Sequence, residues 1–182
     1  MKYVTWSIVV SLLLGLSGCV PSLHELYAEN DVVFEPALLG DWTEDKAESE
    51  SVLTFTRGEG KEYKLVWLER KDKSSFVAHL VKVGDKLFLD LASDPAVDCP
   101  TLSVPVHMFI LVSQTGPTLK MRDFSEEWLK GYLEKSPTAL KHEIVNNDVV
   151  LTASTKQLQS FLLSHVNTKD AFAQPVQYVR KK

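Results

Sequence analysis

A histidine and a carboxylate are the side chains whose predicted placement favours acid–base chemistry. Gly84-Asp85 separates two runs of strand-forming residues, and glycine in the first position fits a two-residue type II′ turn. That turn sets the register of the hairpin, so that His79 faces Asp90. Cross-strand neighbours lie close enough to bond, and the carboxylate would then orient the imidazole. A histidine held in this way is the base half of a hydrolytic triad, or the support of a metal site.

The alternative for His79 and Asp90 is structural, with the two polar groups satisfying one another on a mostly apolar face. Catalysis would also need a nucleophile, and the chain has no Gly-x-Ser-x-Gly elbow. A metal site would need a further ligand, for which His107 is the candidate. The remaining histidines are isolated in the sequence: His24, His142 and His165. We therefore predict that His79 and Asp90 are adjacent, and we predict no catalytic residue, no metal ligand and no cofactor.

Cys19 offers a different chemistry, because its thiol is a nucleophile at the end of an apolar segment. Residues 4–16 form that segment behind the single positive charge of Lys2, and the small residues Ser17 and Gly18 follow it. The segment is shorter than the roughly 20 apolar residues that a membrane-spanning helix needs. Its length and its small-residue ending are typical of a cleaved signal peptide.

The motif Leu16-Ser17-Gly18-Cys19 resembles the lipobox of bacterial lipoprotein precursors. The resemblance implies cleavage before Cys19, a diacylglycerol on its sulfur and an acyl group such as palmitate on its freed amine. Several acyl chains anchor a protein stably, since each buried methylene contributes about 0.8 kcal/mol. Val20 rather than aspartate follows, and resemblance to Gram-negative lipoproteins then implies the outer membrane, facing the periplasm. An ordinary secretory signal or a first transmembrane helix is the alternative.

Composition limits the architecture to one domain. The chain has 182 residues, with 20 Lys and Arg against 24 Asp and Glu, so it is mildly acidic and has no basic stripe that would favour nucleic acid. We expect residues 1–18 to be the signal peptide, 19–36 a lipid-attached connecting segment with at most a short flexible piece at 20–22, and 37–182 a single globular domain. The basic tail 180–182 indicates a frayed terminus. With Cys19 acylated, Cys99 has no partner and is either a buried apolar residue or an exposed thiol.

Short strand-like runs alternate with turn signals, which is typical of an antiparallel sheet or barrel. Predicted strands cover 52–56, 62–68, 75–83, 86–92, 106–113, 118–123 and, as the last one, 149–152. Helices are predicted at 126–135 and 155–165, after the N-caps Ser125 and Ser154. We expect a mainly β (α+β) fold: an antiparallel β-barrel or strongly curved sheet with two packed helices. The alternative is an open α+β sheet with both helices on one face.

Gly40-Asp41-Trp42, preceded by Pro36-Ala37-Leu38-Leu39, resembles the Gly-x-Trp opening of lipocalin-like barrels. The resemblance covers Leu38 to about Asp123. It implies a short helical turn before the first strand, with Trp42 plugging the closed end of the barrel. The whole chain also resembles a group of uncharacterised bacterial lipoproteins, which implies no activity. That second likeness rests on Cys19-Val20-Pro21-Ser22-Leu23, Leu38-Leu39-Gly40-Asp41-Trp42, Ala78-His79-Leu80, Phe88-Leu89-Asp90-Leu91 and Leu151-Thr152-Ala153.

Three functional classes remain open. The leading prediction is a membrane-anchored, non-enzymatic barrel that binds an apolar small molecule in its mouth. The alternatives are an envelope structural or partner-binding lipoprotein and, third, a hydrolase using His79 and Asp90. A packed barrel would favour the structural or partner-binding role, and a hollow barrel would favour ligand binding. Two further features have two interpretations each: the segment 93–105 is a lid or a stiff crossover, and the stripe Trp128, Leu129, Tyr132 and Leu133 is core packing or a ligand platform.

Overall fold

The structure is a computed structural model, and it describes residues 20–94 and 106–181. Cys19 and Cys99 lie outside the described residues, as does most of the predicted loop 93–105. Within the described ranges, no helix is both long enough and apolar enough to cross a lipid bilayer.

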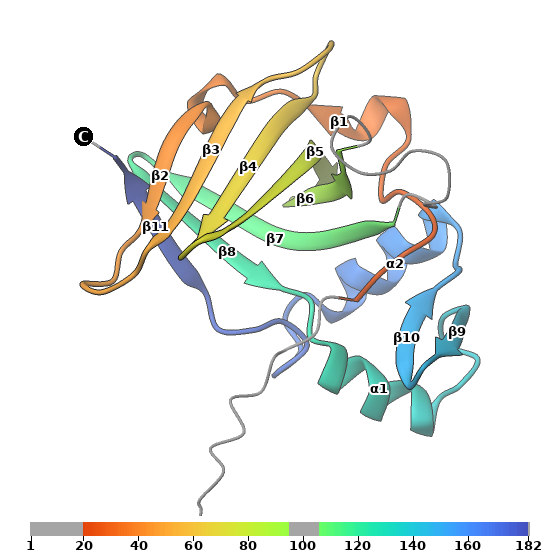
Figure 1. Cartoon of the computed structure of the whole chain (residues 1–182). Coiled ribbons are helices and arrows are strands. Elements are labelled where there is room, and N and C mark those ends of the chain that lie inside the picture. Colours follow the sequence, from red (N-terminus) through yellow and green to blue (C-terminus); the bar gives the residue numbers. More distant parts are fainter. Residues whose placement is uncertain (1–19, 95–105, 182) are drawn as a thin grey trace, which may run out of the picture.

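Eight antiparallel strands close into a barrel (Figure 1). Their order is β5-β4-β3-β2-β11-β8-β7-β6, and β6 pairs with β5 to complete the closure. The strands are β2 (Gly40–Glu44), β3 (Ser51–Arg57), β4 (Tyr63–Glu69), β5 (Asp72–Val83), β6 (Lys86–Ser93), β7 (His107–Thr115), β8 (Thr118–Asp123) and β11 (Val176–Arg180). The predicted lipocalin-like β-barrel with helices is confirmed, and the open-sheet alternative is wrong.

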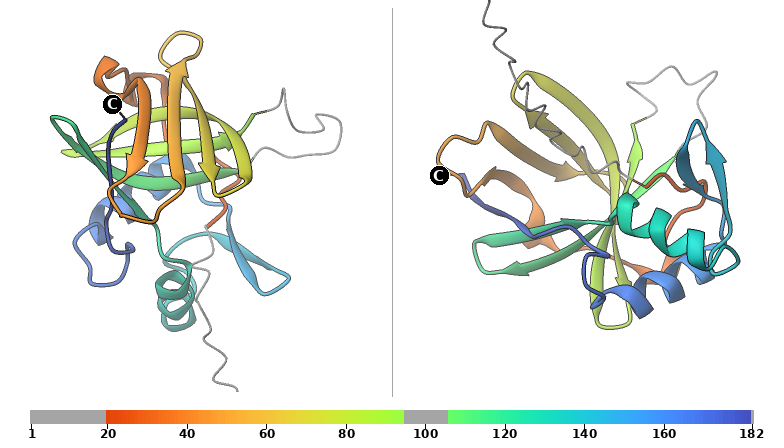
Figure 2. Two further views of the ribbon diagram at one scale, coloured as in Figure 1. Left: turned by 60° about the vertical axis from the view of Figure 1, so that its left-hand side comes forward. Right: turned by 90° about the horizontal axis from the view of Figure 1, so that it is seen from below.

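The remaining elements lie outside the barrel. They are the 3-10 turns η1 (Glu29–Asp31) and η2 (Pro36–Leu38), strand β1 (Val32–Val33) on β5, helices α1 (Glu126–Lys135) and α2 (Thr155–His165), and the hairpin β9 (His142–Val145) with β10 (Asp148–Leu151). Figure 2 shows that both helices gather on one side of the barrel. The helix boundaries agree with those predicted, because local caps set them. Ser125 Oγ accepts the N–H of Trp128 at 3.2 Å, and Ser154 forms a capping box with Gln157.

Several elements differ from the prediction, among them the short strands β1 and β9, which it did not include. The strand at 149–152 is not the last, since β11 follows it and inserts between β2 and β8. The predicted strands 106–113 and 118–123 left four residues between them, but Thr115 pairs with Thr118, so the connection is a two-residue turn. The missed strand β11 depends on pairings between distant segments, which only the assembled sheet reveals.

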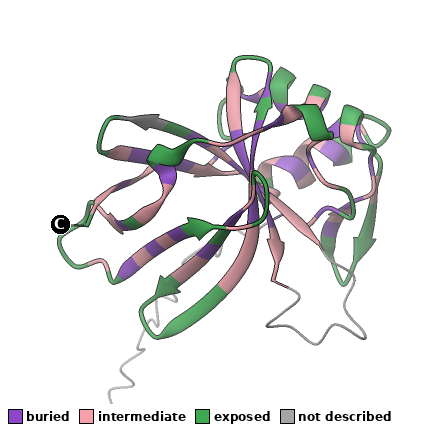
Figure 3. Cartoon of the chain, turned by 90° about the horizontal axis from the view of Figure 1, so that it is seen from above, coloured by how far each residue is buried: buried purple, intermediate pink, exposed green. Residues whose placement is uncertain are grey.

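Large apolar side chains fill the inside of the barrel. Along β3 and β4, buried and more exposed residues alternate, as a strand with one face inside requires (Figure 3). Leu53, Tyr63, Leu65 and Leu89 are 0% exposed to water. A side chain that a water molecule cannot touch lines no water-sized hollow, so the middle of the barrel is packed solid.

Trp42 plugs one end of this barrel, under η2. Its indole N–H donates to the carbonyl of Leu38 at 2.8 Å, and the guanidinium of Arg180 lies 4.4 Å from the centre of its ring. Arg180 also donates to the carbonyls of Ala37 and Leu39. The expected frayed tail is therefore wrong at Arg180, which ties the last strand to the segment before the first strand of the barrel.

A second core lies between the barrel and the helices. Phe88 and Phe109 project outward from β6 and β7 and pack with Leu129 of α1 and with Leu158 and Leu162 of α2. The N-terminal segment joins this layer, because Val20 is 3% and Ser22 0% exposed. The short flexible piece allowed at 20–22 is therefore wrong: this piece is fixed by packing.

Candidate functional site

The predicted polar pair is adjacent, as the turn chemistry required. His79 pairs directly with Asp90 across the hairpin, and Gly84 at its turn has a φ of +60°. Both residues lie on the outer face of the barrel, beneath the N-terminal segment. Asp90 is 1% exposed.

The partner of the Asp90 carboxylate is a different histidine. Asp90 Oδ1 lies 2.6 Å from His107 Nδ1, and Asp90 Oδ2 accepts the backbone N–H of Leu26 at 2.7 Å. His107 was named only as a potential third metal ligand, because the register between β6 and β7 has no turn signal in the sequence. The structure thus brings all three predicted polar residues together, with Asp90 fixing His107.

His79 and His107 differ in their electrostatics. Burial lowers the pKa of His79, and the nearby charges of Glu62 and Asp90 offset this only in part. Burial also acts to lower the pKa of His107, but the hydrogen bond and the charge of Asp90 outweigh it and raise that pKa. The ring of His79 packs against Tyr27 with centroids 4.4 Å apart and the rings tilted by 32°, and its Nε2 lies 3.6 Å from Glu62 Oε1. Burial, together with the charge of Asp90, raises the pKa of Tyr27 to about 12.

The contacts of this cluster fasten the N-terminal segment to the barrel. Asp90 bonds the backbone at Leu26, Tyr27 covers His79, and the backbone of His107 pairs with Ser22 in both directions at 2.9 and 2.8 Å. The nearby hydroxyl of Ser22 donates to the carbonyl of His24 at 2.7 Å. In the described part of the chain, no group of three His, Cys, Asp or Glu side chains has the arrangement of a metal site.

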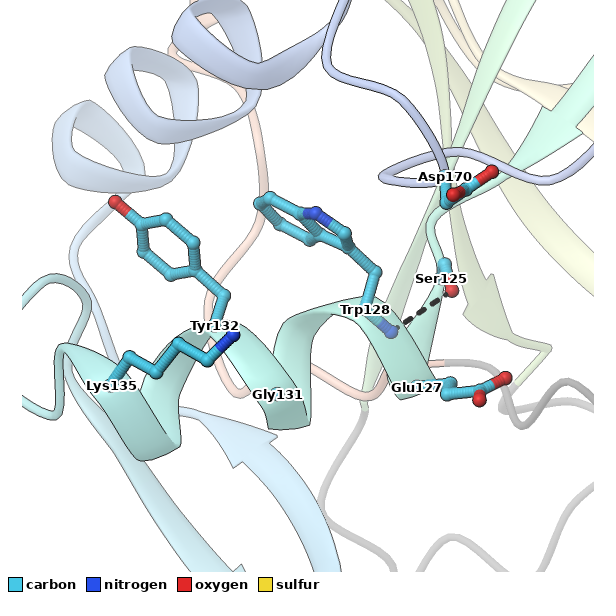
Figure 4. A pocket seen from close by; sticks show the side chains of 7 residues that line it. All are labelled: Ser125, Glu127, Trp128, Gly131, Tyr132, Lys135 and Asp170. Carbon is cyan, nitrogen blue, oxygen red and sulfur yellow. Dashed lines mark hydrogen bonds between the residues drawn. The ribbon is translucent and has the colours of Figure 1, made fainter.

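A cleft opens on the other side of the helical layer, between α1 and the loop after α2 (Figure 4). Its volume is about 470 Å³. Seven residues line it: Ser125, Glu127, Trp128, Gly131, Tyr132, Lys135 and Asp170. In Figure 4 the rings of Trp128 and Tyr132 project from the same side of α1 toward α2, with Glu127 and Asp170 at one end and Lys135 at the other.

The aromatic wall of the cleft is held rigidly. Trp128 and Tyr132 stack with centroids 5.0 Å apart at 24°. Behind them, His165 lies 5.0 Å from the Trp128 ring, 4.9 Å from Tyr132 and 4.5 Å from Phe161. Burial lowers the pKa of His165, which favours the neutral, weakly hydrated ring in this cluster.

The predicted helix stripe therefore divides between two roles. Leu129 is 0% and Leu133 3% exposed, so these two belong to the core. Trp128 and Tyr132 are only half-buried and face the cleft. Helical periodicity identified the stripe, but it carries no information on which part of it a neighbouring element covers.

Gly131 keeps the middle of this cleft open. A Cβ added at Gly131 would meet no atom within 4 Å, so no close packing requires glycine there. Glycine in a helix interior is less stable than alanine by about 0.5–1 kcal/mol. The sequence thus accepts this cost at a position where any larger side chain would project into the cleft. No sequence signal marks Gly131 or Asp170 as residues of this cleft, because only folding brings α1 and the loop after α2 together.

A second hollow, of about 310 Å³, lies at the barrel end that η2 covers. Its apolar lining comes from Leu38, Leu80, Leu87, Val112 and Leu119. Leu119 is 0% and Leu80 1% exposed, so the interior beneath this hollow is packed.

Comparisons with known proteins do not assign the chain to a family. No family model, no curated protein and no solved structure matches the chain.

Proposed function

We propose that the chain is a membrane-anchored, non-enzymatic binding lipoprotein of the bacterial envelope, in which the barrel is a scaffold and the α1 cleft binds a partner protein. The observation that carries this proposal is Gly131, where the helix leaves open space beside a rigid aromatic wall. The packed barrel supports the same choice, since it leaves no water-sized hollow beside its central side chains.

The chemistry of the cleft favours a segment that carries an arginine or lysine. A cation over an aromatic face gains about 0.5–2 kcal/mol, and the paired rings of Trp128 and Tyr132 offer such a face. The carboxylates of Glu127 and Asp170 stand at one end of it. The chain also has a formal net charge of −4, which favours encounter with a basic partner. Trp, Tyr and Arg are the residues that most often dominate protein interfaces.

Anchoring would place this site at the membrane surface. The lipobox-like motif before Val20 supports acylation of Cys19, and Val20 supports the outer membrane. Mass spectrometry of the mature N-terminus tests this part of the proposal. We expect an acylated Cys19, and an unmodified residue other than Cys19 would refute the anchoring.

Peptide binding followed by NMR tests the cleft. The probes are acetyl-Gly-Arg-Gly-amide and, as a charge-reversed control, acetyl-Gly-Glu-Gly-amide, and the signal is the indole N–H of Trp128. We expect the arginine peptide alone to shift this signal. Gly131→Leu should abolish the shift by filling the cleft, whereas Gly131→Ala should preserve it. Equal response to both peptides, or binding of chitotriose in place of the arginine peptide, would refute a basic protein partner.

The hollow under η2 supports a second candidate function, which is the binding of a small apolar molecule. Its lining of leucine and valine side chains favours this ligand class. Native mass spectrometry of the mature protein tests it directly. A co-purified small molecule that disappears in Leu87→Arg would support the hollow as the site, and an unliganded mass would support the cleft proposal.

A further inference from the structure

We propose that the tip of the β9–β10 hairpin rests on the lipid bilayer, held there by the adjacent anchor. This inference rests on the proposed acylation of Cys19. It concerns which face of the domain meets the membrane, and it follows from how the chain after Cys19 is fixed.

Backbone hydrogen bonds hold the segment after Cys19 in place. The N–H of Leu151 donates to the carbonyl of Pro21 at 2.8 Å, and the N–H of Leu23 donates to the carbonyl of Leu151 at 2.9 Å. On the other side, Ser22 exchanges two backbone hydrogen bonds with His107 of β7. The described chain is thus held between two strands from its first residues, and Val20 is buried.

The direction of this segment points the anchor toward the hairpin tip. Ser22 and Leu151 form a parallel bridge, so the chain preceding Ser22 runs in the direction of Asp148, where β10 begins. Asn146 and Asn147 form the turn just before Asp148, with φ of 51° and 74°. Successive Cα atoms are about 3.8 Å apart, so a lipid on Cys19 leaves the domain within a few ångström of Val20.

The side chains at this tip suit a bilayer surface. Ile144 is 59% and Val145 50% exposed, which makes them the most exposed large hydrophobic side chains of the described chain. Single exposed hydrophobic residues are common, but these two adjoin the point where the lipid would enter. Glu143 and Lys141 are exposed nearby, and Asp148 pairs with Lys130 of α1 at 3.4 Å. With charges of both signs, contact would not depend on anionic lipid.

The β3–β4 turn provides a matched control position. In Figure 1 this turn lies at the end of the molecule opposite α1 and the β9–β10 hairpin. Glu59 is an exposed residue within it. A fluorescent label there would report the side that faces away from the bilayer.

The experiment uses the mature acylated protein, with Cys99→Ser, in phosphatidylethanolamine–phosphatidylglycerol vesicles that contain a headgroup-level quencher. One variant carries an environment-sensitive label at Ile144→Cys and the other at Glu59→Cys. We expect at least several-fold stronger quenching at position 144, and a flexible ten-residue insertion between Cys19 and Val20 should reduce it toward the level at 59.

Flotation with the vesicles separates the two proposals. Protein that floats with equal quenching at both positions, or whose quenching ignores the insertion, would overturn the orientation and leave the anchoring intact. Protein that does not float, with an unacylated N-terminus, would overturn both. Protection of the label at 144 without vesicles would overturn the orientation in favour of self-association.

Discussion

The inside of the barrel and its helix-covered side use the same kinds of side chain in different ways. Inside, the largest residues, Trp42 and Tyr63, are both 0% exposed and touch only protein. On the helical side, the rings of Trp128 and Tyr132 stack with centroids 5.0 Å apart but remain half-buried beside open space. Both regions hold their aromatic rings in close contact, but the helical side keeps open space beside its rings, whereas the middle of the barrel is packed.

The polar groups differ in the same way. The packed core inside the barrel is formed by apolar and aromatic side chains, and beside it Ser51 is buried and Asp123 is partly buried, with a pKa that burial raises. The outer face buries a carboxylate, Asp90, whose bonds fix the N-terminal segment. The difference indicates that the barrel provides stability, while the outer layer determines where the anchor leaves and where a partner binds.

The largest effect should come from the barrel plug. Trp42→Ala removes a fully buried ring and its hydrogen bond to Leu38, and should lower the free energy of unfolding by about 3–5 kcal/mol. Urea denaturation of the mature domain measures this. Trp67→Ala, at a half-buried ring of the same barrel, is the matched control and should cost clearly less. Equal losses would mean that the barrel end is not packed around Trp42.

Replacing Asp90 should cause the second-largest loss in the free energy of unfolding. Asp90→Ala leaves the N–H groups of Leu26 and His107 without their acceptor, at a cost of about 1–3 kcal/mol. Asp85→Ala, at the exposed turn of the same hairpin, should leave the free energy of unfolding unchanged. His79→Ala should lower the free energy of unfolding less than Asp90→Ala, because the Asp90 carboxylate would still bond His107 and the backbone of Leu26. A larger loss at His79 would mean that His79 is the main partner of Asp90.

The two histidines should give opposite pH dependence. The raised pKa of His107 stabilises the fold below the unfolded-state pKa, and this gain is lost as pH rises through the folded-state pKa. The lowered pKa of His79 acts in reverse, with stability lost as pH falls through its folded-state pKa. From pH 5 to 8, the advantage of the wild type over His107→Gln should shrink, whereas its advantage over His79→Gln should grow. Parallel trends would contradict the assignment.

The smallest expected change in stability is at Gly131, and it tests whether the cleft is open or packed like the core. Gly131→Ala should raise the free energy of unfolding by about 0.5–1 kcal/mol, because alanine is the better helix former and its Cβ meets no neighbour. Differential scanning calorimetry measures the gain. Gly40→Ala is the contrasting variant: its φ is +110° and its Cβ would approach Arg180 to 2.5 Å, so it should destabilise the barrel end. A destabilising Gly131→Ala would mean that the cleft is closed by packing.

Local chemistry made part of this structure predictable. Ser125 and Ser154 set the helix boundaries and Gly84 set the register of His79 and Asp90, because each signal acts within a few residues. Strand β11 was missed because Tyr178 pairs with Leu119 and Glu44, distant residues whose proximity no local pattern encodes. The bond between His107 and Asp90 and the open space at Gly131 likewise depend on which elements meet after folding.

Backbone NMR of the mature domain, titrated with acetyl-Gly-Arg-Gly-amide, tests the central claim most directly. We expect chemical-shift changes confined to Trp128, Gly131, Asp170 and their neighbours, with the barrel interior unaffected. Changes centred on Leu80, Leu87 and Val112 under η2, or no changes at all, would contradict it.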